Sequence, residues 1–244
     1  MRAVRGFAAY LHSLDASVEI PPQGLLSGNG RRVVPYLYSD AEITALMGQA
    51  QRLRTPLRAA TITTFIGLLA VTGLRAGEAV GLDDADLDVK AALLLVRHAK
   101  GGRQRLVPLH VSTLTALQDY RELRDRAFPR PVSPALLVST AGSRLLYANV
   151  SQTFARLARQ TGLTPRSPAC RPRPHDLRHT FAVATLLDWY RDGGDIAARL
   201  PLLSTYLGHV APANTYWYLE AAPELMAEAA TRLETQPDLN AGPK

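Results

Sequence analysis

The chain has 244 residues, of which 47% are hydrophobic and 20% are charged, and it carries a net charge of +7. This composition excludes a mostly disordered chain, and the longest strongly apolar stretch, residues 65–74, is too short to span a bilayer. A single cysteine, Cys170, excludes an internal disulfide and a four-cysteine zinc site. Residues 1–11 show no secretory signal, and we therefore expect a cytoplasmic protein with no membrane partner.

The positive charge comes almost entirely from arginine, with 25 arginines and only three lysines, Lys90, Lys100 and Lys244. Guanidinium groups match phosphate oxygens in geometry, so chains of this kind often bind nucleic acid. A GC-rich genome produces the same bias, and the net charge alone therefore indicates nucleic acid only weakly.

In chain order, the first expected element is a short helix over residues 5–14, inside a segment, residues 1–20, that looks like the end of another domain. Residues 21–35 are rich in proline, glycine and arginine and are expected to form a linker. The main domain is expected over residues 36–235, and residues 236–244 are expected to be a flexible tail.

The main domain is expected to be mostly helical with a small inserted sheet, an α+β fold. Ser39 or Asp40 can cap its first helix, and the apolar residues 61–72 predict a buried helix that Gly73 ends. Segments rich in valine and leucine predict a β-hairpin over residues 87–97 and 104–109. A loop rich in proline and arginine is expected over residues 162–174, and further helices over residues 111–127, 147–161, 175–191, 196–206 and 222–235.

The sequence Thr-Gly-Leu-Arg-Ala-Gly-Glu, residues 72–78, places Arg75 directly after the end of the buried helix. Glu78 lies three positions further on and can orient the arginine. Taken alone, this segment is explained more simply by a surface ion pair, which contributes little to stability.

The loop of the expected hairpin carries Lys100, followed by two glycines and flanked by further basic residues. A basic hairpin tip can enter a DNA groove, although a solvated turn has the same appearance. Lysine is informative in a chain that otherwise uses arginine, because a partly desolvated lysine can release a proton near neutral pH and arginine cannot. A general acid requires that property.

His175, Arg178 and His179 share one face at the start of an expected helix, and a helix N-terminus favours phosphate. The pattern His-Asp-x-x-His also resembles the zinc motif His-Glu-x-x-His, but aspartate is shorter than glutamate and the intervening arginine would repel a metal. We therefore expect no metal and interpret His179 as a buried, hydrogen-bonded histidine. Cys170 lies nearby without an evident orienting base and is interpreted as incidental rather than as a nucleophile.

Towards the C-terminus, His209 follows a Leu-Gly pair, and Tyr216 and Tyr218 flank a tryptophan. Alone, this segment indicates only packing. Combined with the earlier arginines, lysine and histidines, it fits one reaction, the transfer of a phosphodiester to a tyrosine. Cations would favour the phenolate and hold the charge of the phosphorane, and a lysine would protonate the leaving oxygen. The covalent intermediate would store the bond energy, so neither a nucleotide nor a metal cofactor is needed.

The order of these motifs resembles the catalytic domain of the tyrosine recombinases, the phage integrase family. The resemblance covers roughly residues 36–235, and residues 203–219 are most similar to integrases and transposases of bacterial mobile elements. It implies a mostly helical recombinase fold with a small antiparallel sheet and a basic β-hairpin. The implied function is a site-specific DNA recombinase that cleaves and rejoins DNA through a 3′-phosphotyrosyl intermediate and so mobilises or integrates a DNA element.

The resemblance assigns a role to each residue that matches a family motif. Arg75 corresponds to the first catalytic arginine and Glu78 to the acidic residue that supports it. Arg178 corresponds to the second arginine, and His175 occupies the family's His/Lys position.

The remaining catalytic positions follow in the same way. Lys100 corresponds to the general acid of the hairpin, and His209 occupies the His/Trp position that contacts the scissile phosphate. Tyr218, nine residues after His209, corresponds to the nucleophile, and Tyr216 is the alternative in the same run.

Double-stranded DNA is the implied partner, bound by a homo-oligomer that forms a tetramer in the DNA synapse and associates with the bacterial nucleoid. The amphipathic residues 224–233 are expected either to pack on a neighbouring protomer or to close the same domain. The candidate contacts to DNA phosphates are Arg31, Arg32, Arg103, Arg105, Arg171 and Arg173.

Residues 1–20 match only the last helix of the N-terminal core-binding domain that closes the family's clamp around DNA. Two alternatives therefore stay open: a non-catalytic DNA-binding partner with a recombinase fold, and a type IB topoisomerase that relaxes supercoils. The full set of catalytic residue types favours catalysis. The segment similar to mobile elements favours recombination over relaxation.

Overall fold

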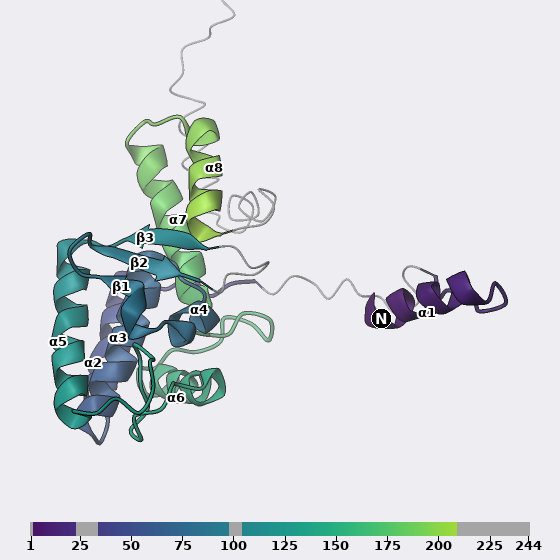
Figure 1. Cartoon of the computed structure of the whole chain (residues 1–244). Coiled ribbons are helices and arrows are strands. Elements are labelled where there is room, and N and C mark those ends of the chain that lie inside the picture. The colour runs from purple at the N-terminus through teal and green to yellow at the C-terminus, as the bar shows by residue number, and fades with distance from the viewer. Residues whose placement is uncertain (1, 23–33, 98–103, 209–244) are drawn as a thin grey trace, which may run out of the picture. The chain divides into compact units, whose positions relative to one another are not determined.

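The computed structural model describes residues 2–22, 34–97 and 104–208, and divides into two compact units, Met1–Val34 and Pro35–Lys244 (Figure 1). Several predictions lie outside the described residues: the helix over residues 222–235, the tail, and Arg31, Arg32, Lys100, Arg103, His209, Tyr216 and Tyr218. Within the described ranges, no helix is both long enough and apolar enough to cross a membrane.

The described part of the first unit contains one helix, α1 (Arg2–Leu14), which includes the expected residues 5–14. The Arg5 guanidinium donates a hydrogen bond of 2.7 Å to the carbonyl of Pro21 and so ties the chain after the helix back onto it.

The second unit is built around a buried helix, α3 (Pro56–Thr72), which packs against α2 (Asp40–Gln51), α5 (Val111–Ala127) and α7 (Asp176–Arg191). Ser39 caps α2, as one of the two predicted caps, and it also exchanges hydrogen bonds with Glu42, which was not predicted. Helix α3 begins five residues earlier than predicted, because Thr55 caps it and Pro56 occupies its first position.

The sheet has three antiparallel strands in the order β1 (Leu87–Asp88), β2 (Leu93–Val96) and β3 (Arg105–Pro108). The sequence predicted a single strand over residues 87–97, and that prediction was wrong. The side chain of Asp88 accepts hydrogen bonds from the backbone amides of residues 90 and 91, which ends β1 in a tight turn. Ala92 completes the turn with a φ of 52°.

The remaining helices are α4 (Ala76–Gly81), α6 (Tyr147–Gln160) and α8 (Ile196–Leu207). The four helices predicted between residues 111 and 206 match α5, α6, α7 and α8 to within about one residue at each end. The six-residue α4 and the 3-10 turn at Asp84–Asp86 were not predicted. Helices α7 and α8 stand side by side in Figure 1 and share an apolar cluster that includes Leu186, Leu200 and Leu203. This mostly helical fold with a small antiparallel sheet confirms the predicted class.

Candidate active site

The ends of four helices and one strand meet at the candidate site. They are the C-termini of α3 and α8, the N-termini of α4 and α7, and the start of β3. Gly73 ends α3 in the left-handed conformation, with a φ of 60°. A Cβ at this position would lie 2.5 Å from a ring carbon of Phe181, so only glycine lets the chain turn directly from α3 into α4.

Arg75 stands at the N-cap of α4, and its side chain joins two elements. One guanidinium nitrogen donates to Glu78 Oε1 at 2.6 Å, and the other donates to the carbonyl of Gly208 at 2.8 Å. The backbone amide of Arg75 also donates to Glu78 Oε2 at 2.9 Å. Arg75 is thus held at three points, with 24% of its side chain still exposed.

Glu78 is not a partner in a surface ion pair, because only 3% of its side chain is exposed. Burial alone would raise the pKa of this carboxyl, but hydrogen bonds and charge from Arg105 and hydrogen bonds from Arg75 outweigh burial and lower the pKa to about 2. Arg105 donates from both terminal nitrogens, at 3.1 Å to Oε1 and 2.7 Å to Oε2. Glu78 is therefore an anion at physiological pH that joins two guanidinium groups.

Arg178 is almost completely buried, with a relative exposure of 1%. Its guanidinium donates to the carbonyl of Gly73 at 2.8 Å and to the carbonyl of Leu207 at 2.6 Å. Both acceptors are C-terminal carbonyls, which lack intrahelical partners and carry partial negative charge. Arg178 thereby ties α7 to the ends of α3 and α8.

His175 precedes α7 and is half-buried beside the arginines. Burial, followed by the positive charges of Arg178, Arg173 and Arg75, lowers the pKa of His175 to about 4. The imidazole is therefore neutral at physiological pH. His179, which the sequence predicted to be buried, is half-buried, and its ring meets that of His175 edge to face with centroids 5.0 Å apart.

The neighbouring polar groups are engaged in protein contacts. Arg173 donates two side-chain hydrogen bonds to the carboxylate of the buried Asp176, from Nε to Oδ2 at 3.0 Å and from a terminal nitrogen to Oδ1 at 2.7 Å. Cys170 is buried in the main core, where its thiol donates to the carbonyl of Pro35 at 3.5 Å. Among the described residues, no three His, Cys, Asp or Glu side chains are grouped closely enough to hold a metal ion.

The structure brings together four of the seven predicted catalytic residues, namely Arg75, Glu78, His175 and Arg178. The other three lie outside the described residues. Of the predicted phosphate contacts, Arg171 is exposed, Arg173 pairs with Asp176 and Arg105 pairs with Glu78. No sequence signal indicates the pairing of Arg105 with Glu78, because the two residues are 27 positions apart and lie on different elements.

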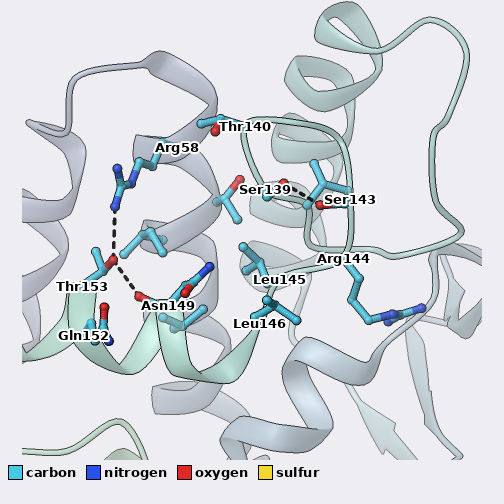
Figure 2. A pocket seen from close by; sticks show the side chains of 14 residues that line it. Arg58, Ser139, Thr140, Ser143, Arg144, Leu145, Leu146, Asn149, Gln152 and Thr153 are labelled. Carbon is cyan, nitrogen blue, oxygen red and sulfur yellow. Dashed lines mark hydrogen bonds between the residues drawn. The ribbon is translucent and has the colours of Figure 1, made fainter.

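A separate cavity of about 420 Å³ lies between α3, α6 and the loop before α6. Figure 2 shows Arg58 at one side, where it donates to Thr153 at 3.3 Å, and Ser139 paired with Ser143 on the loop. None of the predicted site residues lines this cavity.

Three comparisons place this arrangement among known proteins. The sequence model of the phage integrase family matches residues 37–224. The protein called integrase/recombinase y4rB of Sinorhizobium fredii is 45% identical over 237 residues, which cover 95% of this chain and 76% of the relative. The crystal structure of the XerA recombinase is 25% identical and superposes with a TM-score of 0.65, over 84% of this chain and 67% of that one.

A lambda integrase tetramer bound to a Holliday junction shares the fold alone. The TM-score is 0.57 at 19% identity, over 86% of this chain and 55% of that one.

Proposed function

Because the chain belongs to the phage integrase family, the tyrosine recombinases, we propose that it breaks and rejoins DNA with Arg75, Arg178 and Tyr218 acting on one phosphodiester. The supporting observation is the convergence of the two arginines. Arg75 precedes the three strands in the sequence and Arg178 follows them. The two side chains nevertheless donate to the carbonyls of adjacent residues, Gly208 and Leu207. Two guanidinium groups this close can bind the nonbridging oxygens of a single phosphate and the charge of its phosphorane.

Tyr218 reacts as its phenolate, after its proton has passed to solvent: Oη attacks the phosphorus, a bond forms between them, and the bond to the 5′ oxygen breaks. Lys100 donates a proton to the leaving 5′ oxygen. The product is a 3′-phosphotyrosyl link and a free 5′ hydroxyl, and attack by a second 5′ hydroxyl reverses the step. No external energy source is required, because one phosphodiester replaces another.

His175 and His209 complete the proposed site. As a neutral imidazole, His175 can donate one hydrogen bond to a phosphate oxygen without adding a charge. His209 follows Gly208 directly in the sequence, and the carbonyl of Gly208 bonds Arg75. The chain segment that carries His209 thus starts beside the first arginine.

The proposed substrate is double-stranded DNA, and the proposed working form is a homo-oligomer that assembles as a tetramer on two DNA duplexes. Residues 224–233 are the candidate contact to a neighbouring protomer. The exposed Arg171, with Arg31, Arg32 and Arg103, would contact phosphates and so make binding dependent on salt.

Covalent trapping tests this function. The protein is mixed with nicked duplexes that include the DNA flanking its own gene, denatured, and analysed for a protein–DNA adduct. We expect an adduct that Tyr218→Phe abolishes and Tyr216→Phe does not. DNA binding without any adduct would instead support a non-catalytic partner. Relaxation of supercoiled plasmid without a defined site would support a topoisomerase.

A further inference from the structure

Arg105 is the first residue of β3, where it pairs with Val96 in the last strand pair before the hairpin loop. Its side chain is 11% exposed and turns inward, with both terminal nitrogens on Glu78. A bidentate pair of this kind between a guanidinium and a buried carboxylate fixes the planes of both groups. Arg105 is thus less exposed than Arg75, of which 24% remains accessible, and Glu78 takes up both of its terminal nitrogens.

The same carboxylate holds the proposed phosphate-binding arginine. Glu78 Oε1 accepts from Arg75 at 2.6 Å and from Arg105 at 3.1 Å, and Oε2 accepts from the Arg75 amide at 2.9 Å and from Arg105 at 2.7 Å. Each oxygen therefore serves both arginines. Loss of Arg105 would remove two of the four hydrogen bonds that orient the carboxylate and half of the positive charge that neutralises it.

Arg105 also lies near Gly208, the other residue that Arg75 bonds. A Cβ added to Gly208 would lie 3.0 Å from a terminal nitrogen of Arg105, so the guanidinium fills the space beside this glycine, whose carbonyl accepts from Arg75. Arg105 thus bonds one partner of Arg75 and lies close to the other, on the strand that follows the segment carrying Lys100.

We propose that Arg105 is a positioning residue, which orients Arg75 toward the scissile phosphate through Glu78 and does not itself bind DNA. The proposal rests on the function proposed above. The strand that bears Arg105 also leads out of the Lys100 segment, so the same contact ties the loop end of the hairpin to Glu78, the partner of Arg75. The competing role for Arg105 is a direct phosphate contact. Its Nε is buried and has no hydrogen-bond partner among the described residues, so this N–H group could donate to a phosphate oxygen.

The test compares Arg105→Met and Arg105→Lys with a control, Arg124→Met. Arg124 is a matched control because its side chain is 10% exposed and is paired with Asp84, away from the site. For each folded variant, the single-turnover rate of adduct formation and the Kd for the same nicked duplex are measured over a range of salt concentrations. Thermal melts identify the temperature at which all variants are folded.

We expect Arg105→Met to slow adduct formation by about 10- to 100-fold, with Kd and its salt dependence unchanged. Arg105→Lys retains the positive charge but cannot donate the two parallel hydrogen bonds to Glu78, so we expect its rate to lie between those of Arg105→Met and the wild type. Arg124→Met should react at the wild-type rate. A weaker Kd for Arg105→Met, with a salt slope reduced by about one, would overturn the proposal in favour of a direct phosphate contact.

A double-mutant cycle gives a second, independent result. If Arg105 acts through Arg75, then Arg105→Met should slow the Arg75→Lys variant little further. If the double variant instead loses rate by the product of the two single-variant losses, the proposal is overturned. If the wild-type protein forms no adduct, the proposed function fails and the inference fails with it. If the wild type reacts and Arg105→Met matches Arg124→Met, the inference alone fails.

Discussion

The guanidinium groups of Arg75 and Arg178 donate to the carbonyls of consecutive residues at the end of α8, at 2.8 and 2.6 Å. Carbonyls in the last turn of a helix lack intrahelical partners, so this end carries partial negative charge and attracts cations. The two arginines and the helix end therefore stabilise one another. The account predicts that perturbing any member of this unit affects both stability and DNA cleavage.

Replacing Arg178 with methionine should destabilise the fold by about 2–4 kcal/mol, because two buried carbonyls lose a charged donor. Chemical denaturation gives the free energy of unfolding. Arg166→Met is the matched control, since Arg166 also donates to a backbone carbonyl, at 3.1 Å, but is exposed. Equal losses from the two variants would contradict the account.

Gly73→Ala should lower the free energy of unfolding by at least about 1–2 kcal/mol, because alanine resists the left-handed conformation. The clash with Phe181 adds to this cost. The control is Gly48→Ala inside α2, where an added Cβ meets nothing within 4 Å and helix propensity favours alanine. A Gly73→Ala variant as stable as Gly48→Ala would refute the role assigned to the turn.

His175 should make the protein less stable as the pH falls from 6.5 to about 4. Its folded pKa is lowered from 6.5 to about 4, so in this window the unfolded chain binds a proton that the folded chain does not. His175→Asn should flatten the dependence of unfolding free energy on pH within this window. His110→Asn is the matched control for the loss of a histidine, because His110 is an exposed helix cap at which asparagine can also serve. Identical pH profiles for wild type and His175→Asn would disprove this assignment.

Arg171 is exposed next to the site and should contribute one phosphate contact. Arg171→Gln should therefore weaken the Kd for duplex DNA and reduce the slope of log Kd against log salt by about one. Arg121→Gln provides the comparison, because Arg121 is paired with Asp84 at 2.7 Å on α5. If both variants show the wild-type slope, Arg171 does not contact phosphate.

Local signals in the sequence predicted much of the fold. Ser39 or Asp40 marked the start of α2, and Gly73 marked the end of α3, because caps depend on residues close in sequence. The early start of α3 was missed although Thr55 and Pro56 signal it. The break between β1 and β2 was missed because the apolar residues on both sides look continuous, and the break depends on an Asp88 turn.

The motifs predicted which residue types meet at the site, but not how they are held. The pairing of Arg75 with Glu78 follows from their spacing within one helical turn. The bonds from Arg178 to Gly73 and Leu207 depend on tertiary packing between helices distant in sequence, and the same is true of Arg105 on Glu78. Such contacts leave no periodic pattern for sequence reasoning to detect.

The most direct test of the central claim is to identify the residue that becomes linked to DNA. The trapped adduct is digested with protease and nuclease, and the peptide that retains a nucleotide is sequenced by mass spectrometry. The account predicts a nucleotide 3′-phosphate on Tyr218, in an adduct that Arg75→Ala and Arg178→Ala each reduce. A nucleotide on Tyr216 or on any other residue, or an adduct indifferent to both arginines, would contradict it.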